Sequence, residues 1–397
     1  MTRKTKRAIF ILIFSEFLVC LGISLVIPVM PFIKNELHLT ATDMGIMNAL
    51  FALAQFVASP IIGRVSDKIG RKPVLTVGLF LYMASEVLFA LTNQLVVFNI
   101  SRVIGGLSAA MVVPTAMALA ADITTRQQRA RVIGWLSAAF SGGLILGPGI
   151  GGILAGISYK TPFWVAGALG LLSAIVLITL LPNDAEHDEA ADDAPVVAEP
   201  TAHPMTRAFW TVPIIILFTM ILVSSFGLQG FESIYSIYVN EVFNFSLSNI
   251  ALVLTLNGLI SLFFQVALFD GLVRRFGETR LIRTCFFLAA VCTIWITQAH
   301  GKLAVIIATL VIFTAFDLLR PAITTLLTKA SEANQGLING LNMSLTSIGN
   351  IVGPIMSGML LDMNTHYPYL VVSVFLVISF IMAFLLKQPK ATPRTAE

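Results

Sequence analysis

The chain carries one glycine pattern twice, about 206 residues apart, and both copies lie inside long apolar stretches. The first copy is Gly134, Gly143, Gly147, Pro148, Gly151 and Gly152, and the second is Gly340, Gly349, Gly353, Pro354, Ser357 and Gly358. Glycine weakens a helix in water, but inside a membrane it lets two helix backbones pack closely. The repeat therefore predicts a membrane protein with two homologous halves and one tightly packed helix in each. We expect the first copy to seal one side of a central cavity and the second mainly to record the duplication.

Composition supports a chain that spans a membrane many times. Hydrophobic residues make up 57% of the 397 residues and charged residues 12%, whereas soluble domains average roughly 45–50% and 25%. A bilayer core takes about 20 apolar residues per helix. Twelve runs reach that length, at roughly 8–33, 44–66, 73–92, 95–121, 130–157, 161–182, 208–238, 246–269, 279–299, 302–328, 334–361 and 367–387. The predicted fold class is an all-α membrane protein with twelve transmembrane helices in two six-helix halves.

The sixth and seventh runs are separated by a segment of different character. Residues 183–206 hold seven Asp and Glu residues together with several prolines, a composition that cannot bury a core. We therefore predict an N-terminal half at 1–182, an acidic linker at 183–206 and a C-terminal half at 207–397.

The positions of Lys and Arg indicate the orientation. Of the 25, only Lys34, Lys160 and Lys302 fall outside when the N-terminus is cytoplasmic, and Arg102 and Arg320 fall within the membrane, which leaves 20 on the inner side. Cytoplasmic loops of membrane proteins carry such an excess. We expect a multi-pass protein of the cytoplasmic membrane with the linker and both termini inside the cell.

Several functional classes are excluded by what the sequence contains. The net charge of +4 is spread over short loops, so no nucleic-acid surface is expected. Cys20, Cys285 and Cys292 lie in apolar runs and fit no metal spacing, so they are interpreted as core residues. The sequence has no Ser-His-Asp set and no phosphate-binding glycine loop. We therefore expect no enzyme, no metal and no cofactor, with a proton gradient rather than ATP as the energy source.

We single out five charged residues within the predicted membrane segments as candidates: Glu16, Arg102, Glu232, Asp317 and Arg320. Burying a charged side chain in the bilayer costs at least a few kcal/mol, so each of these residues is expected to have a structural partner or a function. Glu232 shares a helix face with Gln229, and it either exchanges a proton, pairs with a cationic substrate, or makes a structural hydrogen bond. Asp317 and Arg320 share a face as well, either as a static ion pair or as a switch that separates when Asp317 binds a proton.

The N-terminal half holds the other two charges. Arg102 precedes several small residues, and its expected partners are polar atoms of the first helix or the Glu16 carboxyl. Glu16 lies on one face with Cys20 and Ser24. It is interpreted either as a proton site or as part of a structural pairing.

Polar and aromatic side chains are expected to line a cavity around these charges. Besides Glu232 and Asp317, the candidate substrate-binding residues are Phe51, Gln55, Phe140, Tyr235, Gln265, Phe316 and Asn342. An apolar, aromatic cavity with a few carboxyls suits large hydrophobic cations. It suits sugars and phosphates poorly.

A charged turn joins the second and third runs. It contains Gly63, Asp67, Gly70 and Arg71. We interpret it as a cytoplasmic latch that holds one half against the other, or else as a positively charged turn without a special role.

These motifs resemble the major facilitator superfamily. The turn from Gly63 to Arg71 resembles its signature between helices 2 and 3, and Arg102 with Gly106 resembles the signature of helix 4, although Gly105 stands where glutamine is common. The pattern from Gly134 to Gly152 is similar to the antiporter signature of helix 5. The segments around Glu232, and from Phe316 to Ala322, are similar to Gram-positive multidrug pumps. The resemblance implies that Glu232 and Asp317 are the coupling and substrate carboxyls, and Glu16 departs from the pattern because an uncharged residue is usual there.

The resulting prediction is a proton-coupled antiporter that exports hydrophobic, often cationic drugs by alternating access. The expected partners are small-molecule drugs, protons and the lipid bilayer, and we expect a monomer. Two alternatives stay open: a proton-coupled exporter of an endogenous metabolite such as a sugar or polyamine, and a membrane sensor that transports nothing.

Overall fold

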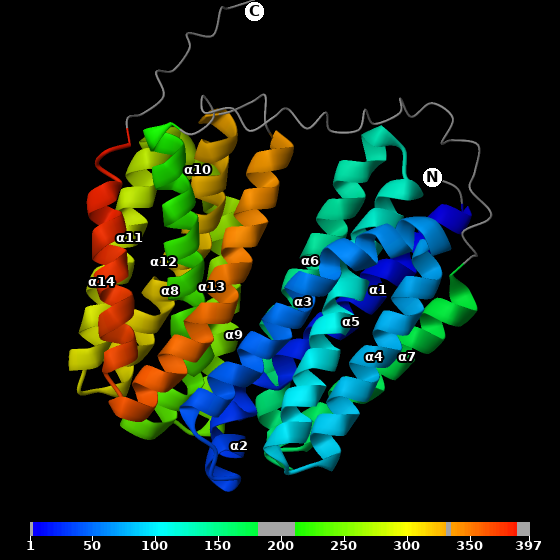
Figure 1. The fold of residues 1–397 in the computed structure, drawn as a ribbon, viewed down its shortest axis with the longest axis horizontal. Coiled ribbons are helices and arrows are strands. Elements are labelled where there is room, and N and C mark those ends of the chain that lie inside the picture. The colour runs from blue at the N-terminus through cyan, green and yellow to red at the C-terminus, as the bar shows by residue number, and fades with distance from the viewer. Residues whose placement is uncertain (1–2, 182–210, 331–334, 387–397) are drawn as a thin grey trace, which may run out of the picture.

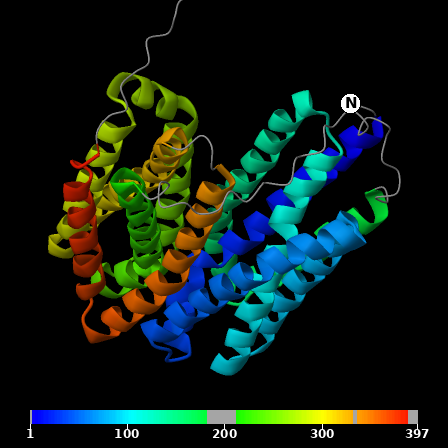
Figure 2. The ribbon, with the colours of Figure 1, turned by 45° about the horizontal axis from the view of Figure 1, so that its top comes forward.

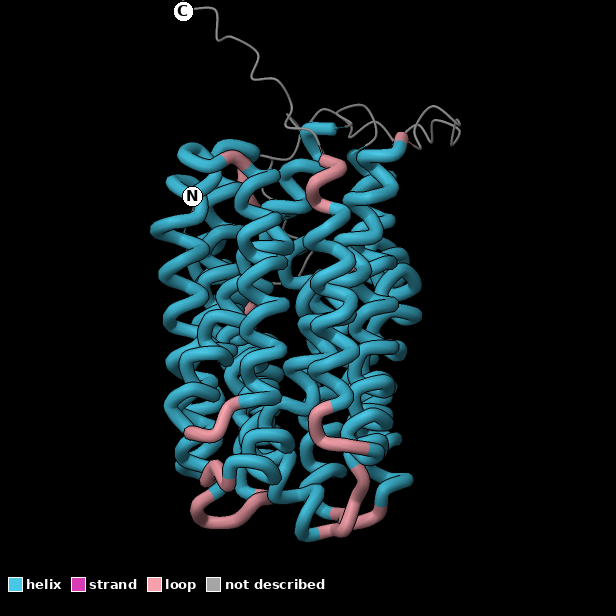
Figure 3. The backbone as a smooth tube through the Cα atoms, turned by 90° about the vertical axis from the view of Figure 1, so that its left-hand side faces the viewer, coloured by secondary structure: helices cyan, strands magenta, loops and turns pink. Residues whose placement is uncertain are grey.

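The computed structural model describes residues 3–181, 211–330 and 335–386, and every described element is helical (Figures 1 and 3). The N-terminal half consists of α1 (Arg3–Leu25), η1 (Ile27–Val29), α2 (Met30–Glu36), α3 (Ala41–Ile69), α4 (Arg71–Leu91), α5 (Leu95–Asp122), α6 (Arg126–Ala155) and α7 (Thr161–Leu180). The C-terminal half consists of α8 (Val212–Phe243), α9 (Leu247–Phe263), η3 (Phe264–Leu268), α10 (Phe269–Phe276), α11 (Glu278–Gln298), α12 (Lys302–Ala330), α13 (Gln335–Met363) and α14 (Tyr367–Met382). The predicted linker at 183–206 lies outside the described residues.

The twelve predicted spans correspond to these helices. Eleven helical segments of the described chain are long and apolar enough to cross a membrane, and α14 is a shorter apolar helix. Two spans are not the continuous helices that we expected. The first is interrupted at η1, beside Pro28 and Pro31, because proline removes a backbone donor and clashes with the preceding turn. The eighth contains the π-helical turn η3 and continues as α10 to Phe276.

The duplication extends to the backbone. Gly70 and Gly277, which stand 207 positions apart, start α4 and α11 with positive φ angles of 94° and 77°. His38 and Asn244, 206 positions apart, are the two non-glycine residues with positive φ in the described chain, at 51° and 50°. Such conformations are uncommon for residues with a side chain. Their recurrence at matching positions indicates that the halves share one fold.

The two halves lie side by side and meet at one end of the bundle (Figures 1 and 2). That end holds α2 together with the N-termini of α3 and α9 and the C-termini of α6, α8 and α13. We call it the α2 end. Contacts between the halves run along two seams, α3 with α13 and α6 with α9, and α2 and α3 also contact α8.

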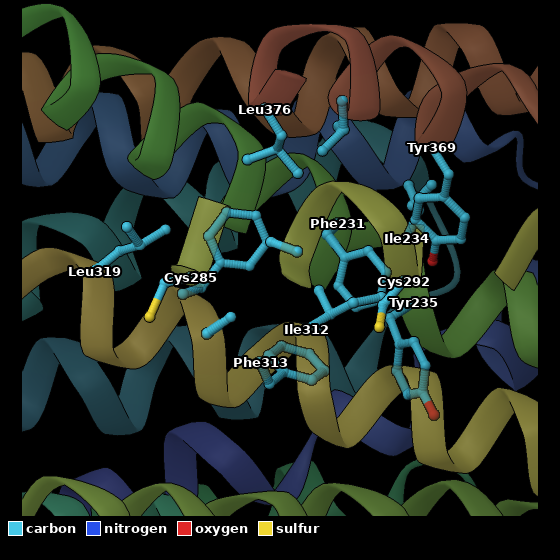
Figure 4. Packing of buried hydrophobic residues seen from close by; sticks show 14 of the residues in the cluster. Phe231, Ile234, Tyr235, Cys285, Cys292, Ile312, Phe313, Leu319, Tyr369 and Leu376 are labelled. Carbon is cyan, nitrogen blue, oxygen red and sulfur yellow. The ribbon is translucent and has the colours of Figure 1, made fainter. Parts of the chain in front are cut away.

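Each half has its own apolar core. In the C-terminal half, Phe231 packs edge-on against Phe313, with ring centroids 5.3 Å apart, and lies 4.8 Å from Tyr369 (Figure 4). In the N-terminal half, Phe89 stacks on Phe98 and Phe163 at 4.2 and 4.3 Å. The three cysteines are free and buried, as predicted.

Candidate functional site

The two carboxyls of the C-terminal half lie on neighbouring helices. Glu232 is on α8, and its Oε2 accepts a hydrogen bond from Gln229 Nε2 at 3.2 Å, as their shared helix face predicts. Asp317 is on α12, within electrostatic reach of Glu232. Both side chains are partly buried. Two acids that interact electrostatically inside a membrane bundle repel each other when both are charged.

Arg320 does not neutralise Asp317 directly. The two residues lie three apart on α12 and interact electrostatically, yet within the described chain no ion pair joins them at 4.0 Å or less. Arg320 is exposed, whereas Asp317 lies near Ser261 of α9. The interpretation as a static ion pair therefore fails in this conformation, and Arg320 is open to other partners.

Phe316 and Tyr235 lie in the core rather than in a cavity, contrary to our expectation. Phe316 is 2% exposed, and a Cβ placed on Gly227 of α8 would lie 3.2 Å from its ring. Tyr235 is fully buried, with its ring 5.8 Å from those of Phe231 and Phe313. Successive helical residues point about 100° apart. Tyr235 and Phe316 therefore point in other directions than the polar residues beside them in the sequence.

The remaining candidates of the C-terminal half lie on two helices near Arg320. Asn342 on α13 donates from Nδ2 to Thr324 Oγ1 of α12 at 3.2 Å, one turn from Arg320. Gln265 is exposed and belongs to the π-helical turn η3. Such turns recur at functional sites because they re-aim the side chains of a helix.

The candidates of the N-terminal half lie on α3 and α6. Phe51 and Gln55 are partly buried on α3, where a Cβ on Gly105 would lie 3.3 Å from the Phe51 ring. Phe140 is partly buried on α6. All three therefore belong to helices that form the seams, in the half opposite Glu232 and Asp317.

Arg102 pairs with Glu86, not with Glu16 as expected. Arg102 Nη2 lies 3.1 Å from Glu86 Oε1, and both side chains are buried. The guanidinium also lies 4.8 Å from the centroid of the Phe89 ring. Next to the pair, Ser85 and Ser101 exchange hydrogen bonds of 2.8 and 3.0 Å with each other's backbone carbonyls. This network joins α4 to α5 inside the N-terminal half.

The Glu16 side chain is buried, with 2% of its surface exposed, and it makes few polar contacts. The Sγ atom of Cys20 donates to Oε1 at 4.0 Å, and Oε2 has no hydrogen-bond partner among the described residues. Ser24, on the same face, donates to the Gly143 carbonyl of α6 at 3.0 Å. The face Glu16–Cys20–Ser24 is thus directed into the N-terminal half.

The glycine pattern packs helices in both copies. A Cβ on Gly143 would lie 2.7 Å from the Leu21 amide nitrogen of α1, and one on Gly349 would lie 2.7 Å from the Phe226 nitrogen of α8. The last glycine of each copy faces the other half: Gly152 meets Ala251, and Gly358 meets Ala41. The second copy therefore does more than record the duplication. A Cβ on the first glycines, Gly134 and Gly340, would meet no atom of another described element within 4 Å.

The charged turn is held within the N-terminal half. Arg71 Nη1 lies 2.5 Å from Asp67 Oδ1, and its Nε lies 3.0 Å from Asp122 Oδ2 at the end of α5. Gly63 has open space around it. The expected contact of this turn with the other half is absent from the described residues, because the halves meet at the α2 end.

Comparison with known proteins identifies the family. A family model described as the Major Facilitator Superfamily matches residues 12–329 and 233–397. The chain belongs to the major facilitator superfamily. It is 40% identical over 379 residues to Multidrug resistance protein 1 of Bacillus subtilis, with 96% of each chain covered. It is 38% identical to the Quinolone resistance protein NorA of Staphylococcus aureus, over 97% of this chain and 98% of that one.

Solved structures agree with this superfamily fold. A bacterial homologue of the human lysosomal transporter Spinster, described as inward-facing and occupied, matches with a TM-score of 0.80 at 16% identity over 97% of both chains. The nucleoside transporter NupG matches with a TM-score of 0.74 at 14% identity over 97% of this chain and 98% of that one. At such identities the likeness concerns the fold alone.

Glu86 is the residue of this superfamily member that sequence reasoning missed. It stands within the predicted span at 73–92, so its charge was visible. Its pairing was not, because α4 and α5 cross at an angle that no spacing within one helix encodes. The described residues contain no group of three or more His, Cys, Asp or Glu side chains suited to a metal ion.

Proposed function

We propose that the protein is a proton-driven exporter of hydrophobic, often cationic drugs. The observation that carries this proposal is the pair of neighbouring carboxyls, Glu232 and Asp317, neither of which forms an ion pair with a described Lys or Arg. A cationic drug and protons can then compete for the same two acids. The names of the relatives, multidrug resistance proteins and a quinolone resistance protein, support drugs as the cargo.

The orientation follows the distribution of positive charge. Basic residues such as Arg274 and Arg275 belong to α10, which lies at the end opposite α2 (Figure 1), so we infer that this end faces the cytoplasm together with both termini. The α2 end is then extracellular. With the halves joined there, a drug enters from the cytoplasm or the inner leaflet and reaches the carboxyls.

The cycle runs by exchange at the carboxyls. Drug binding favours the ionised acids and releases protons. After the halves rock and the α2 end opens, protons from the outside neutralise Glu232 and Asp317 and displace the drug. Arg320 takes part as a mobile cation that pairs with Asp317 in a step of the cycle other than the conformation described above. Arg102 and Glu16 support coupling from the N-terminal half, and the unit that performs the cycle is one chain.

Proteoliposomes with an imposed pH gradient test this function. We expect accumulation of a lipophilic dye that collapses when an uncoupler is added, and loss of that accumulation in Glu232→Gln and Asp317→Asn. Wild-type rates in both variants would overturn the assignment of the carboxyls. Gradient-driven transport of a polyamine or sugar, but of no dye, would favour the exporter of an endogenous metabolite, and no transport of any solute would favour a sensor.

A further inference from the structure

The N-terminus of α3 is capped by a carboxylate from the other half. Asp362, in the last turn of α13, accepts hydrogen bonds from the backbone nitrogens of Ala41 and Thr42, each at 2.8 Å. Its Oδ2 also accepts from Thr42 Oγ1 at 2.5 Å. Three hydrogen bonds to one carboxylate thus cross the seam between α3 and α13.

The contact between Asp362 and the N-terminus of α3 is strong because it joins a negative charge to free backbone amides. The first amides of a helix have no partner within the helix and carry partial positive charge, so a carboxylate there is stabilising. Hydrogen bonds to a charged group contribute more than neutral ones. Because donor and acceptor belong to different halves, the contact exists only while the α2 end is closed.

The rest of this seam is built for close contact. A Cβ on Gly358 would lie 2.9 Å from the Ala41 carbonyl carbon, and one on Gly45 would lie 2.9 Å from the carbonyl carbon of Pro354. At the rim, Lys34 Nζ lies 2.6 Å from Glu241 Oε1. Rim ion pairs of this kind contribute little, because solvent screens them.

Among the described residues, the seam between α6 and α9 has no such carboxylate cap. Counting back 206 residues from Asp362 leads to Gly156, which has no side chain to offer. The N-terminus of α9 is capped by its own Ser246, whose Oγ accepts from the Asn249 nitrogen at 3.3 Å. The seam between α6 and α9 is closed by small residues, such as Gly152 against Ala251. Only one of the two seams of the described chain therefore shows a carboxylate cap across the halves.

We propose that Asp362 is the latch of the α2 end: a carboxylate on α13 that caps α3 across the seam and is released each time that end opens. This inference rests on the proposed alternation between two open ends, but not on the identity of the cargo. Removal of the latch shifts the balance toward the conformation that is open at the α2 end.

The N-terminus of α3 also offers a matched control variant. Asp43 is a second carboxylate at the same N-terminus, and its Oδ2 accepts from the Thr40 nitrogen at 2.9 Å and from Thr40 Oγ1 at 2.7 Å. These contacts lie within the N-terminal half. Asp43→Asn and Asp362→Asn therefore remove the same charge from the same helix end, and only the second one breaks a bond between the halves.

The experiment measures the distance between spin labels across the α2 end, without drug and without a pH gradient. Labels on cysteines at the exposed positions Asn93 and His300 report separation of the halves and lie away from the latch. A second pair, at Gln127 and Arg274, reports the opposite end. We expect Asp362→Ala and Asp362→Asn to raise the ratio of open to closed α2 ends by at least about tenfold. The distance between the labels at Gln127 and Arg274 should become shorter at the same time. Asp43→Asn should stay within about twofold of wild type.

Two results would overturn the latch. One is an unchanged distance distribution in both Asp362 variants, and the other is an equal shift in Asp43→Asn, which would indicate general weakening of the α3 N-terminus. If Asp362→Ala fails to fold, the isosteric Asp362→Asn carries the measurement. The distance measurements need no cargo. If the Asp362 variants shift the distances as expected but the wild-type protein transports no dye, the proposed function is refuted and the latch is not.

Discussion

The two halves share a backbone plan and hold their membrane charges in opposite ways. In the N-terminal half, Arg102 and Glu86 are buried and paired at 3.1 Å. In the C-terminal half, Glu232 and Asp317 interact electrostatically from neighbouring helices, and Arg320 is exposed and forms no ion pair with a described residue. A satisfied pair is rigid, whereas two neighbouring acids can exchange protons and ligands. The comparison indicates that one half serves as a stable frame and the other as the chemical site.

The glycine pattern, in contrast, is used alike in both halves. Gly143 and Gly349 bring α6 and α13 against α1 and α8, and Gly152 and Gly358 bring the same helices against the opposite half. Duplication has thus preserved the packing while the charges diverged. Substitutions that remove the charges and the close glycine contacts of each half separately test this division.

The strongest test removes the charges of the C-terminal half. Asp317→Asn and Glu232→Gln should each lower gradient-driven dye transport about 100-fold, because a neutral side chain can neither carry the proton nor hold the cation. Drug exchange without a gradient should persist in at least one variant, since it requires no net proton movement. Thermal unfolding of both variants should stay close to wild type. Retained coupling in both would place the chemistry elsewhere.

The second test removes one partner of the buried pair in the N-terminal half. Glu86→Ala should lower stability by about 3–5 kcal/mol, because the Arg102 charge stays buried without its counterion. Thermal unfolding in detergent measures the effect. The double variant Glu86→Gln with Arg102→Gln should recover much of the loss. If Glu86→Ala unfolds like wild type but loses its response to the pH gradient, the N-terminal half is a chemical site as well.

The third test compares the two glycine copies. Gly147→Val and Gly353→Val should each cost about 1–3 kcal/mol by overpacking a close helix contact. Ser24 lies against Gly147, and Phe226 and Gly230 lie against Gly353. Folded yield and unfolding temperature report the loss, and Gly134→Ala, at an open position, is the control. Unequal losses in the two copies would show that their packing is not equivalent.

The smallest effect is expected at Glu16. Glu16→Gln should change the rate of cation export about fivefold or less, a coupling free energy of roughly 1 kcal/mol, because this carboxyl lies in the half without the drug carboxyls. Transport of several cations at matched pH gradients measures it. Complete loss of coupling would move Glu16 into the central site.

Much of the fold follows from the sequence because its signals are local. Run length and hydrophobicity locate the helices, and the glycine spacing identifies the helices that pack most closely. The breaks at Pro28 and in η3 were not predicted, since each depends on how one turn fits its neighbours. The acids of the C-terminal half were found because a charge in a membrane span stands out.

The partners of those charges could not be predicted. The pairing of Arg102 with Glu86, the burial of Phe316 and the cap of Asp362 on Ala41 each join residues on different helices. Such contacts are set by crossing angles and by the closed state of one end, and a single sequence reports neither. The sequence shows that Glu86 lies in a membrane span, but it does not show which neighbouring helix its side chain faces.

The buried cysteines have a practical consequence. Cys20, Cys285 and Cys292 are all shielded within the helix bundle, and none of them forms a disulfide. A thiol reagent modifies an accessible thiolate, so these three should react slowly while the protein stays folded. The natural chain can therefore accept a label at an introduced surface cysteine with its own thiols left in place. That keeps Cys20, whose thiol contacts the Glu16 carboxyl, present in every labelled variant.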